Sequence, residues 1–212
     1  NGLVVEAYTY TYLTSGVNAG LVDRVVMSRK IVATNAETVV RQAKFDYYDG
    51  SQLGGNPGNL RLETIQDAAG QALDSSYFRY YTSNGLAGYA DGMKYVFHNE
   101  AYARLYAAVG DPSSVADSAI APYADNYYEY DADHRVTKSV VQGAGCSCAG
   151  STGAGEYIYA YYASAFTGAD PNIWKSKTVE TLPDGNQNVY YFNAGGELLF
   201  KAFVVQADSV DP

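Results

Sequence analysis

Short aromatic segments recur along this chain, and their spacing is the feature that most limits its possible folds. They centre on Tyr8, Phe45, Phe78, Tyr128, Tyr159 and Tyr191, so the successive steps are 37, 33, 50, 31 and 32 residues. A recurrent step of this length indicates a repeat architecture in which each repeat is one supersecondary unit. The single long step places an insertion between Tyr81 and Tyr127. The sequence therefore predicts six repeats.

Residues 126–143 show the repeat most clearly. Tyr128 and Tyr130 are two positions apart and therefore share one face of a predicted strand. The polar segment 131–134 follows, and short side chains of this kind bond their own backbone and tolerate a tight reversal. Alternation resumes from Val136, which predicts the return strand of a hairpin. The predicted fold class is mainly β, with tandem antiparallel β-hairpins that form a continuous sheet.

The same hairpin resembles a known repeat. It is similar to the YD repeat of the RHS family, in which an aromatic residue, any residue and Tyr-Asp are followed, after two or three residues, by Arg and an aliphatic residue. The residues that match this motif are Tyr128, Tyr130, Asp131, Arg135 and Val136. A second match contains Tyr190 and Phe192, with Asn193 at the position of the family's Asp.

This resemblance extends over about residues 120–205 and is weak before them. Residues 45–50 match only in part. Residues 142–148 and 178–186 resemble stretches of large planctomycete RHS-repeat surface proteins. The resemblance implies a long sheet that winds into a spiral shell or tube, with no active site in the repeats, at the cell surface or outside the cell.

The predicted insertion has a different period. One face of an amphipathic helix would be formed by Tyr102, Leu105, Tyr106 and Val109. Asn99 is a suitable N-cap, and Gly110 suits the position after the last turn. The Asp-Pro pair that follows predicts a second short turn, which ends before Pro122. The insertion therefore covers residues 98–122, with helix near 99–119.

Two interpretations of this insertion stay open: it covers the sheet or fills a hollow formed by it, or it is a binding element. The chain as a whole is predicted to be a single β domain of residues 1–212. It is either a section of a longer repeat protein or one subunit of a polymer. No signal-like segment follows Asn1, which is consistent with a processed product or with a piece of a longer protein.

Composition argues against two classes of function. The chain has 23 acidic and 14 basic residues and a net charge of -9, and the basic residues are scattered. Phosphate binding requires clustered Lys and Arg, so nucleic acid is not an expected partner. A transmembrane helix requires about eighteen consecutive apolar residues, and the sequence contains no such run. We therefore expect neither nucleic-acid binding nor a membrane span.

Both cysteines, Cys146 and Cys148, lie in the Gly-rich segment 143–155. Two thiols cannot complete a structural zinc site, which takes four ligands. A disulfide between them would close a small, strained ring. Bonds to a neighbouring chain and free thiols are the other possibilities. The extracellular setting implied by the resemblance favours a disulfide of some kind.

Catalysis is not expected. Asp131, Asp133 and His134 lie close together near Glu129, which would allow a carboxylate and histidine pair or a weak calcium site. Turns contain such residues for backbone reasons, and His98 precedes the helix in a position that suits capping. No nucleophile elbow, phosphate loop or metalloprotease motif is present. We predict a non-enzymatic protein without a cofactor or a metal.

Tyrosines are expected to line the strands in rows. One row contains Tyr8, Tyr10 and Tyr12, and another contains Tyr157, Tyr159 and Tyr161. Alternation predicts that the second row meets Tyr128 and Tyr130 across a strand pair. In the return strand 21–33, the set expected to face inward is Val25, Met27, Arg29 and Ile31.

The first and last predicted strands lack the features that usually protect a sheet edge. Residues 3–12 contain one Glu and no Pro, and residues 198–205 contain one Lys and no Pro. Such edges favour addition of a further strand. The predicted function is a structural building block of an extracellular shell, tube or fibre, whose partner is another copy or an adjacent repeat. The alternative is a carbohydrate-binding or adhesion module that uses exposed tyrosine faces.

Overall fold

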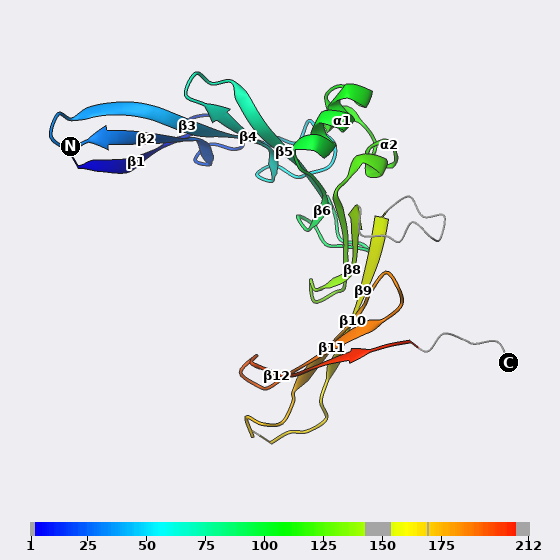
Figure 1. Ribbon diagram of the computed structural model, residues 1–212. Coiled ribbons are helices and arrows are strands. Elements are labelled where there is room, and N and C mark those ends of the chain that lie inside the picture. Colours follow the sequence, from blue (N-terminus) through cyan, green and yellow to red (C-terminus); the bar gives the residue numbers. More distant parts are fainter. Residues whose placement is uncertain (1–2, 143–153, 169, 207–212) are drawn as a thin grey trace. The chain divides into compact units, whose positions relative to one another are not determined.

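The computed structural model describes residues 3–142, 154–168 and 170–206 (Figure 1). The protein is mainly β, with antiparallel strands joined as successive hairpins, which confirms the predicted fold class. The chain forms two compact units, Asn1–Asp125 and Asn126–Pro212. We refer to them as unit 1 and unit 2 and describe each by itself. In both units the sheet order follows the order of the strands in the sequence.

Six strands form the sheet of unit 1, and each pairs with the next in an antiparallel sense. They are β1 (Val4–Tyr12), β2 (Val22–Ile31), β3 (Ala36–Tyr47), β4 (Leu60–Asp67), β5 (Ala72–Tyr80) and β6 (Met93–Phe97). Valine, threonine and tyrosine are frequent in β1, and β-branched and aromatic residues of this kind suit a pleated surface.

The sheet of unit 2 is built in the same way. Its strands are β7 (Asn126–Tyr130), β8 (Val136–Gln142), β9 (Ala154–Ala163), β10 (Ser176–Thr181), β11 (Gln187–Phe192) and β12 (Leu198–Val204). The six aromatic segments of the sequence are the six odd-numbered strands of the chain. One repeat of thirty-odd residues is therefore one aromatic strand and its return strand.

Short helices separate β6 from β7, within unit 1 (Figure 1). They are α1 (Asn99–Val109), a 3₁₀ turn (Pro112–Ser114), α2 (Asp117–Ile120) and a second 3₁₀ turn (Ala121–Tyr123). The predicted insertion is thus present. Its predicted N-cap is wrong, because the cap position is His98, and Asn99 instead accepts a hydrogen bond from the Ser75 N–H. Gly110 ends α1 as predicted, with φ of 74°.

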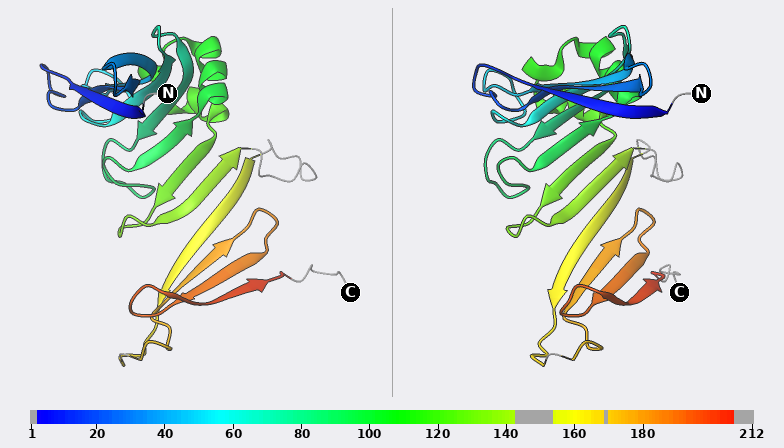
Figure 2. Two further views of the ribbon diagram at one scale, coloured as in Figure 1. Left: turned by 60° about the vertical axis from the view of Figure 1, so that its left-hand side comes forward. Right: turned by 90° about the vertical axis from the view of Figure 1, so that its left-hand side faces the viewer.

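The core of unit 1 lies where α1 covers β5 and β6 (Figure 2). Leu105 of α1 and Phe97 of β6 are fully buried, and Tyr77 of β5 is 1% exposed. Tyr102 stacks on Tyr77 with ring centroids 5.8 Å apart. Tyr106, predicted for the same helix face, is 54% exposed and contacts the ring of Tyr102 at the rim of this core.

Two predictions about facing side chains are wrong. In β2 the buried residue is Ser28, on the face opposite to Met27, while Ile31 is 40% exposed. Among the described elements, β2 contacts mainly β1 and β3 of the same sheet, so alternation alone could not select a buried face. Tyr157 does not meet Tyr128 directly, because both lie opposite Ser139 of the intervening strand β8.

The residues directly before β10 are not part of the strand. The strand begins at Ser176, because the Ile173 N–H donates to the carbonyl of Asp170 in a turn. Trp174 leaves the strand pattern and packs edge-on against Tyr191, with ring centroids 5.6 Å apart. An aromatic residue next to a strand can thus fill space on a sheet face without belonging to the ladder.

Candidate functional sites

Three hairpins are closed by the same five-residue turn, which begins at Asp67, Asp131 or Asn193. A side-chain oxygen of this first residue accepts the N–H groups two and four positions later, at 2.9 to 3.0 Å. The first N–H also donates to the carbonyl of the fifth residue, and the fourth N–H donates to the first carbonyl. The first side chain therefore satisfies turn N–H groups that the ladder leaves unpaired.

The fourth residue of each turn has the left-handed backbone conformation that the reversal requires. The values of φ are 85° at Gly70, 62° at His134 and 79° at Gly196. Glycine adopts this conformation without strain, and a non-glycine residue there is uncommon. His134 is thus placed by the turn, which gives a backbone reason for its proximity to Asp131 and Asp133.

A β-bulge follows each of these turns at the same distance. The register skips Leu73, Thr137 and Leu199, each six residues after the first turn residue. A bulge adds one residue to one strand and increases the local twist. The three hairpins, from both units, are therefore copies of one structural unit that includes the turn and the strand after it.

The turn at Asp131 contains Asp131 and Arg135, two of the residues that resemble the YD motif. Arg135 donates from Nε to Asp131 Oδ2 at 2.8 Å, and its guanidinium lies 4.5 Å from the ring centroid of Tyr161. The Tyr161 hydroxyl donates to the carbonyl of Val136 at 2.7 Å. Hydrogen bonds from Arg135 lower the pKa of Asp131. The motif therefore links the turn to β9, two strands away from β7.

The turn at Asn193 explains why an amide replaces the carboxylate there. The fifth residue of this turn is Glu197, where the Asp131 turn has Arg135. Asn193 Nδ2 donates to Glu197 Oε2 at 2.8 Å and to the carbonyl of Pro171 at 3.1 Å. A carboxylate at this buried position would face two acceptors and could donate to neither. The first and fifth residues are therefore Asn and Glu in this turn, where the Asp131 turn has Asp and Arg.

Tyrosines on one face of unit 2 surround a single carboxylate. Glu180 accepts hydrogen bonds from the hydroxyls of Tyr159 and Tyr190, at 3.3 and 3.1 Å, and from Asn188 Nδ2 at 2.9 Å. Burial, with a smaller effect of Glu180, raises the pKa of Tyr159 to about 12. Phe192 lies half-buried on β11. The rings of this face are therefore held by cross-strand hydrogen bonds.

The tyrosine row of β1 has a different environment. Tyr8, Tyr10 and Tyr12 are 54%, 54% and 55% exposed. They lie opposite Met27, Val25 and Val22 of β2. These three rings are more exposed than those of Tyr157, Tyr159 and Tyr161, which are half-buried.

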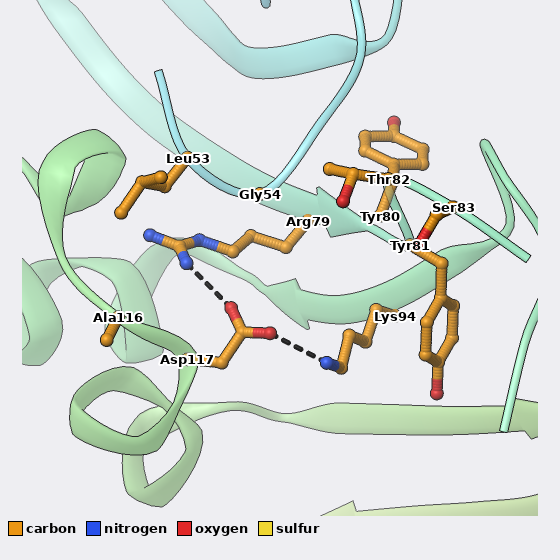
Figure 3. Close-up of a pocket in the computed structure, with 10 residues that line it drawn as sticks. All are labelled: Leu53, Gly54, Arg79, Tyr80, Tyr81, Thr82, Ser83, Lys94, Ala116 and Asp117. Atoms are coloured by element: carbon orange, nitrogen blue, oxygen red, sulfur yellow. Dashed lines mark hydrogen bonds and ion pairs between the residues drawn. The ribbon is translucent and has the colours of Figure 1, made fainter. Parts of the chain in front are cut away.

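A buried arginine, which sequence reasoning did not identify, joins β5 to the helical insertion (Figure 3). Arg79 is 1% exposed. Its Nη1 donates to Asp117 Oδ1 at 2.7 Å, and its Nη2 donates to the carbonyls of Pro112 and Val115. Its Nε donates to the Tyr77 hydroxyl at 3.0 Å. These bonds account for the buried charge, so the cluster around Arg79 fixes the position of the insertion.

Asp117 connects Arg79 to the solvent-accessible Lys94. Lys94 Nζ donates to Asp117 Oδ2 at 2.7 Å, on one side of an open pocket of about 400 Å³ (Figure 3). Burial acts to raise the pKa of Asp117, but the hydrogen bonds from Lys94 and Arg79 outweigh it and hold the pKa below its ordinary value. The charged groups of this pocket, Arg79, Asp117 and Lys94, are paired with one another, which is the arrangement of a structural clamp.

The loop before β4 fits closely against this clamp. A Cβ on Gly54 would lie 2.4 Å from Arg79 Cδ, and one on Gly55 would lie 2.3 Å from the ring of Tyr48. The Gly54 carbonyl accepts the Tyr80 N–H at 2.7 Å. The Gly-Gly pair and a lone arginine within an aromatic strand were the only signals in the sequence, and neither identified Asp117 as the partner.

The terminal strands are exposed at their outer edges. Among the described residues, β1 pairs only with β2, and β12 pairs only with β11. The exposed apolar side chains of β12 include Leu198, Phe200, Phe203 and Val204. On β1, Val4 is 53% exposed. These edges are where the structure places unpaired backbone groups next to apolar surface.

No protein-family model matches this chain, and no curated protein matches it. Its class is therefore given by its fold and sites alone: a mainly β protein of repeated hairpins. No helix in the part of the chain that the structure describes is long and apolar enough to cross a membrane. No group of three or more His, Cys, Asp or Glu side chains within residues 3–142, 154–168 and 170–206 could hold a metal ion. Cys146 and Cys148 lie outside the described residues.

Proposed function

We propose that this chain is a non-enzymatic structural protein, whose hairpin repeats form part of a larger extracellular sheet through pairing at β1 and β12. The observation that carries the proposal is the low charge of both edge strands. β1 has one charged residue, Glu6, and β12 has one, Lys201. In unit 1 the inner strands β2 and β3 have four each, whereas in unit 2 the inner strand β11 has none.

This distribution is the opposite of what protects a sheet edge. Edge strands in monomeric proteins are usually short, charged, interrupted by proline or covered by another element. β1 has nine residues and β12 has seven, and neither contains proline. Their composition is that of strands with a neighbour on both sides, which supports an assembly in which each edge is covered by a further strand.

The repeated turn gives independent support. Three hairpins share one turn and one bulge position, although their strands differ in sequence. Such a unit extends a sheet by two strands at a time and needs no change of topology, as in other repeat proteins. The resemblance to YD repeats agrees with this proposal and favours a location at the cell surface or outside the cell.

Proline at an outward-facing position of β1 tests whether assembly depends on strand pairing at this edge. The Leu3 carbonyl accepts the Val32 N–H, so odd-numbered residues of β1 bond β2 and the backbone of Tyr8 faces outward. Tyr8→Pro removes an outward N–H and leaves the β1–β2 ladder in place. We expect wild-type protein to form filaments, tubes or shells by electron microscopy and sedimentation velocity, and Tyr8→Pro to block them.

Tyr8→Ala is the matched control, because it removes the same ring and retains the N–H group. We expect Tyr8→Ala to assemble. Wild-type protein that stays monomeric at every concentration, or a Tyr8→Pro variant that assembles as well as Tyr8→Ala, would contradict the proposal.

A second candidate is a carbohydrate-binding or adhesion module, favoured by the exposed rings of Tyr8, Tyr10 and Tyr12. Stacking on a sugar requires free ring faces, which this row provides. The β9 row is less suitable, because the hydroxyls of Tyr159 and Tyr161 are hydrogen-bonded within the sheet. Glycan-array binding that is lost when the β1 row is replaced by alanine, and retained when Tyr157, Tyr159 and Tyr161 are replaced, would support this candidate.

A further inference from the structure

The outer edge of β12 can be assigned in the same way as that of β1. The Asn193 N–H donates to the Glu197 carbonyl, and the bulge at Leu199 then places Phe200 opposite Tyr191. Backbone bonding alternates along a strand. The backbone groups of Phe200 and Ala202 therefore face β11, and those of Lys201 and Phe203 face outward.

The alternation of inward-facing and outward-facing backbone groups limits the registers in which β12 could pair with β1. In an antiparallel pair, two opposite residues either exchange both backbone hydrogen bonds or exchange none. The outward residues of β1 include Val4, Glu6 and Tyr8, so each must lie opposite an outward residue of β12. The register that places Glu6 opposite Lys201 meets this condition.

We propose that the partner at these edges is a second copy of this chain, and that β12 of one copy pairs antiparallel with β1 of the next, with Glu6 opposite Lys201. This inference rests on the proposed structural function and names its partner and register. Glu6 and Lys201 are the only charged residues of the two strands. Opposite charges across a strand pair are favourable, and like charges there are unfavourable.

The neighbouring strands extend this match. Glu6 lies opposite Arg29 of β2, and the closest oxygen-to-nitrogen distance between them is 3.9 Å. Lys201 lies opposite Tyr190 of β11, with Nζ 5.1 Å from the ring centroid. The junction would therefore form one row of Arg29, Glu6, Lys201 and Tyr190, in that order across the strands. In this row Glu6 and Lys201 each have a favourable neighbour on both sides.

Side-chain size also fits this register. The large ring of Phe200 would lie opposite the small Ala7, and Ala202 would lie opposite Val5. Phe200 is 60% exposed, and its ring packs against Tyr191, at 6.0 Å between centroids. A neighbouring strand with a small residue at this position leaves room for the ring while it covers the exposed edge.

Charge reversal tests the register. Glu6→Lys gives a junction with two lysines, and Lys201→Glu gives one with two glutamates. We expect each variant alone to raise the concentration needed for assembly about tenfold, since a like-charge pair replaces a favourable one. An equimolar mixture of the two variants is expected to assemble within about twofold of wild type, because alternating copies restore an opposite-charge pair at every junction.

Sedimentation velocity on the full chain measures all four samples, with Tyr8→Pro as the blocked reference. The register would be overturned if the single variants assembled like wild type, or if their mixture assembled no better than either variant alone. If Tyr8→Pro still blocked assembly in that case, the proposed function would stand. A wild-type chain that stays monomeric would overturn the assignment of a second copy. If Tyr8→Pro assembled as well as wild type, assembly would not depend on strand pairing at the outer edge of β1, and the proposed function would be contradicted.

Discussion

The helix-covered end of unit 1 and the sheet of unit 2 use similar strands in different ways. At β5, β6 and α1, five side chains that include Phe97 and Leu105 are less than 2% exposed. The only apolar side chain of unit 2 below 9% exposure, among the described residues, is Val189. The first region has a core, and the second is a single layer whose side chains are mostly half-buried.

The comparison shows two ways to stabilise a tyrosine-rich sheet. Burial of a large aromatic side chain contributes about 1.5 to 3 kcal/mol. In unit 2 the described stabilising contacts run across strands, such as Lys138 with Glu156 at 2.8 Å and Lys177 over the ring of Tyr162 at 4.4 Å. Each cross-strand pair contributes about 0.2 to 1 kcal/mol. The stability of a single-layer sheet therefore depends on many small cross-strand contributions and on rows of side chains that continue from strand to strand.

The largest difference is expected for the two arginine and aspartate pairs. Arg79→Met leaves four hydrogen-bond acceptors at the covered end of unit 1 without their donor and should lower the free energy of unfolding by about 3 to 5 kcal/mol. Arg135→Met should have a small effect, because its pair with Asp131 is exposed to solvent. Urea unfolding followed by circular dichroism measures both. Equal effects would show that burial does not distinguish these pairs.

Gly54→Ala tests the close fit of the loop in the covered region. Its φ is 93°, and the added Cβ would lie 2.4 Å from Arg79. Backbone strain and overpacking together predict a loss of about 2 to 4 kcal/mol. Gly58→Ala is the matched control in the same loop, with φ of 95° and open space, and should cost about 1 to 2 kcal/mol. Thermal unfolding that ranks Gly58→Ala as more harmful would contradict this account.

Asn193→Asp tests the hydrogen bond between Asn193 and Glu197 in the single-layer sheet of unit 2. The new carboxylate would face Glu197, and we expect a loss of about 1 to 3 kcal/mol in unfolding free energy at pH 7. Asn193→Asp combined with Glu197→Arg recreates the pair seen at Asp131 and Arg135, so it should recover most of this loss. Denaturant unfolding of the single and double variants measures the recovery. An unchanged double variant would show that the two turns are not equivalent.

The smallest predicted effect is the acid response of the clamp. The pKa of Asp117 in the folded state is lower than its ordinary value of 3.8. The ionised carboxylate therefore contributes stability that is fully present above about pH 4 and is lost as the pH falls through the lower folded pKa. Asp117→Asn should flatten this part of the pH dependence of stability. The same slope below pH 4 in wild type and variant would exclude Asp117 as its source.

Local chemistry accounts for the parts that sequence reasoning predicted well. Alternation and turn residues were sufficient for the hairpins, and the Asp-rich break at 131–134 predicted a reversal that backbone hydrogen bonds confirm. Burial was harder to predict. Ser28 is 2% exposed while Ile31 of the same strand is 40% exposed, so the alternation of apolar residues did not identify the buried position.

The Arg79 clamp could not be predicted because its parts are distant in sequence. Arg79 of β5 and Asp117 of α2 are separated by 38 residues. Gly54 lies in the loop before β4, the strand that precedes β5. No local pattern relates these positions. The tyrosine rows were identified from alternation, but only the strand order showed that β8 lies between Tyr128 and Tyr157.

The sequence by itself determined that this protein is built from repeated antiparallel hairpins with one helical insertion, because strand alternation and turn formation depend on residues close together in the chain. The tertiary structure decided which strands are covered, which charge is buried and which edges stay open, because these properties depend on contacts between distant residues. The edge strands β1 and β12, with one charged residue each, show both contributions: their composition is local, and their exposure follows from their places in the sheet.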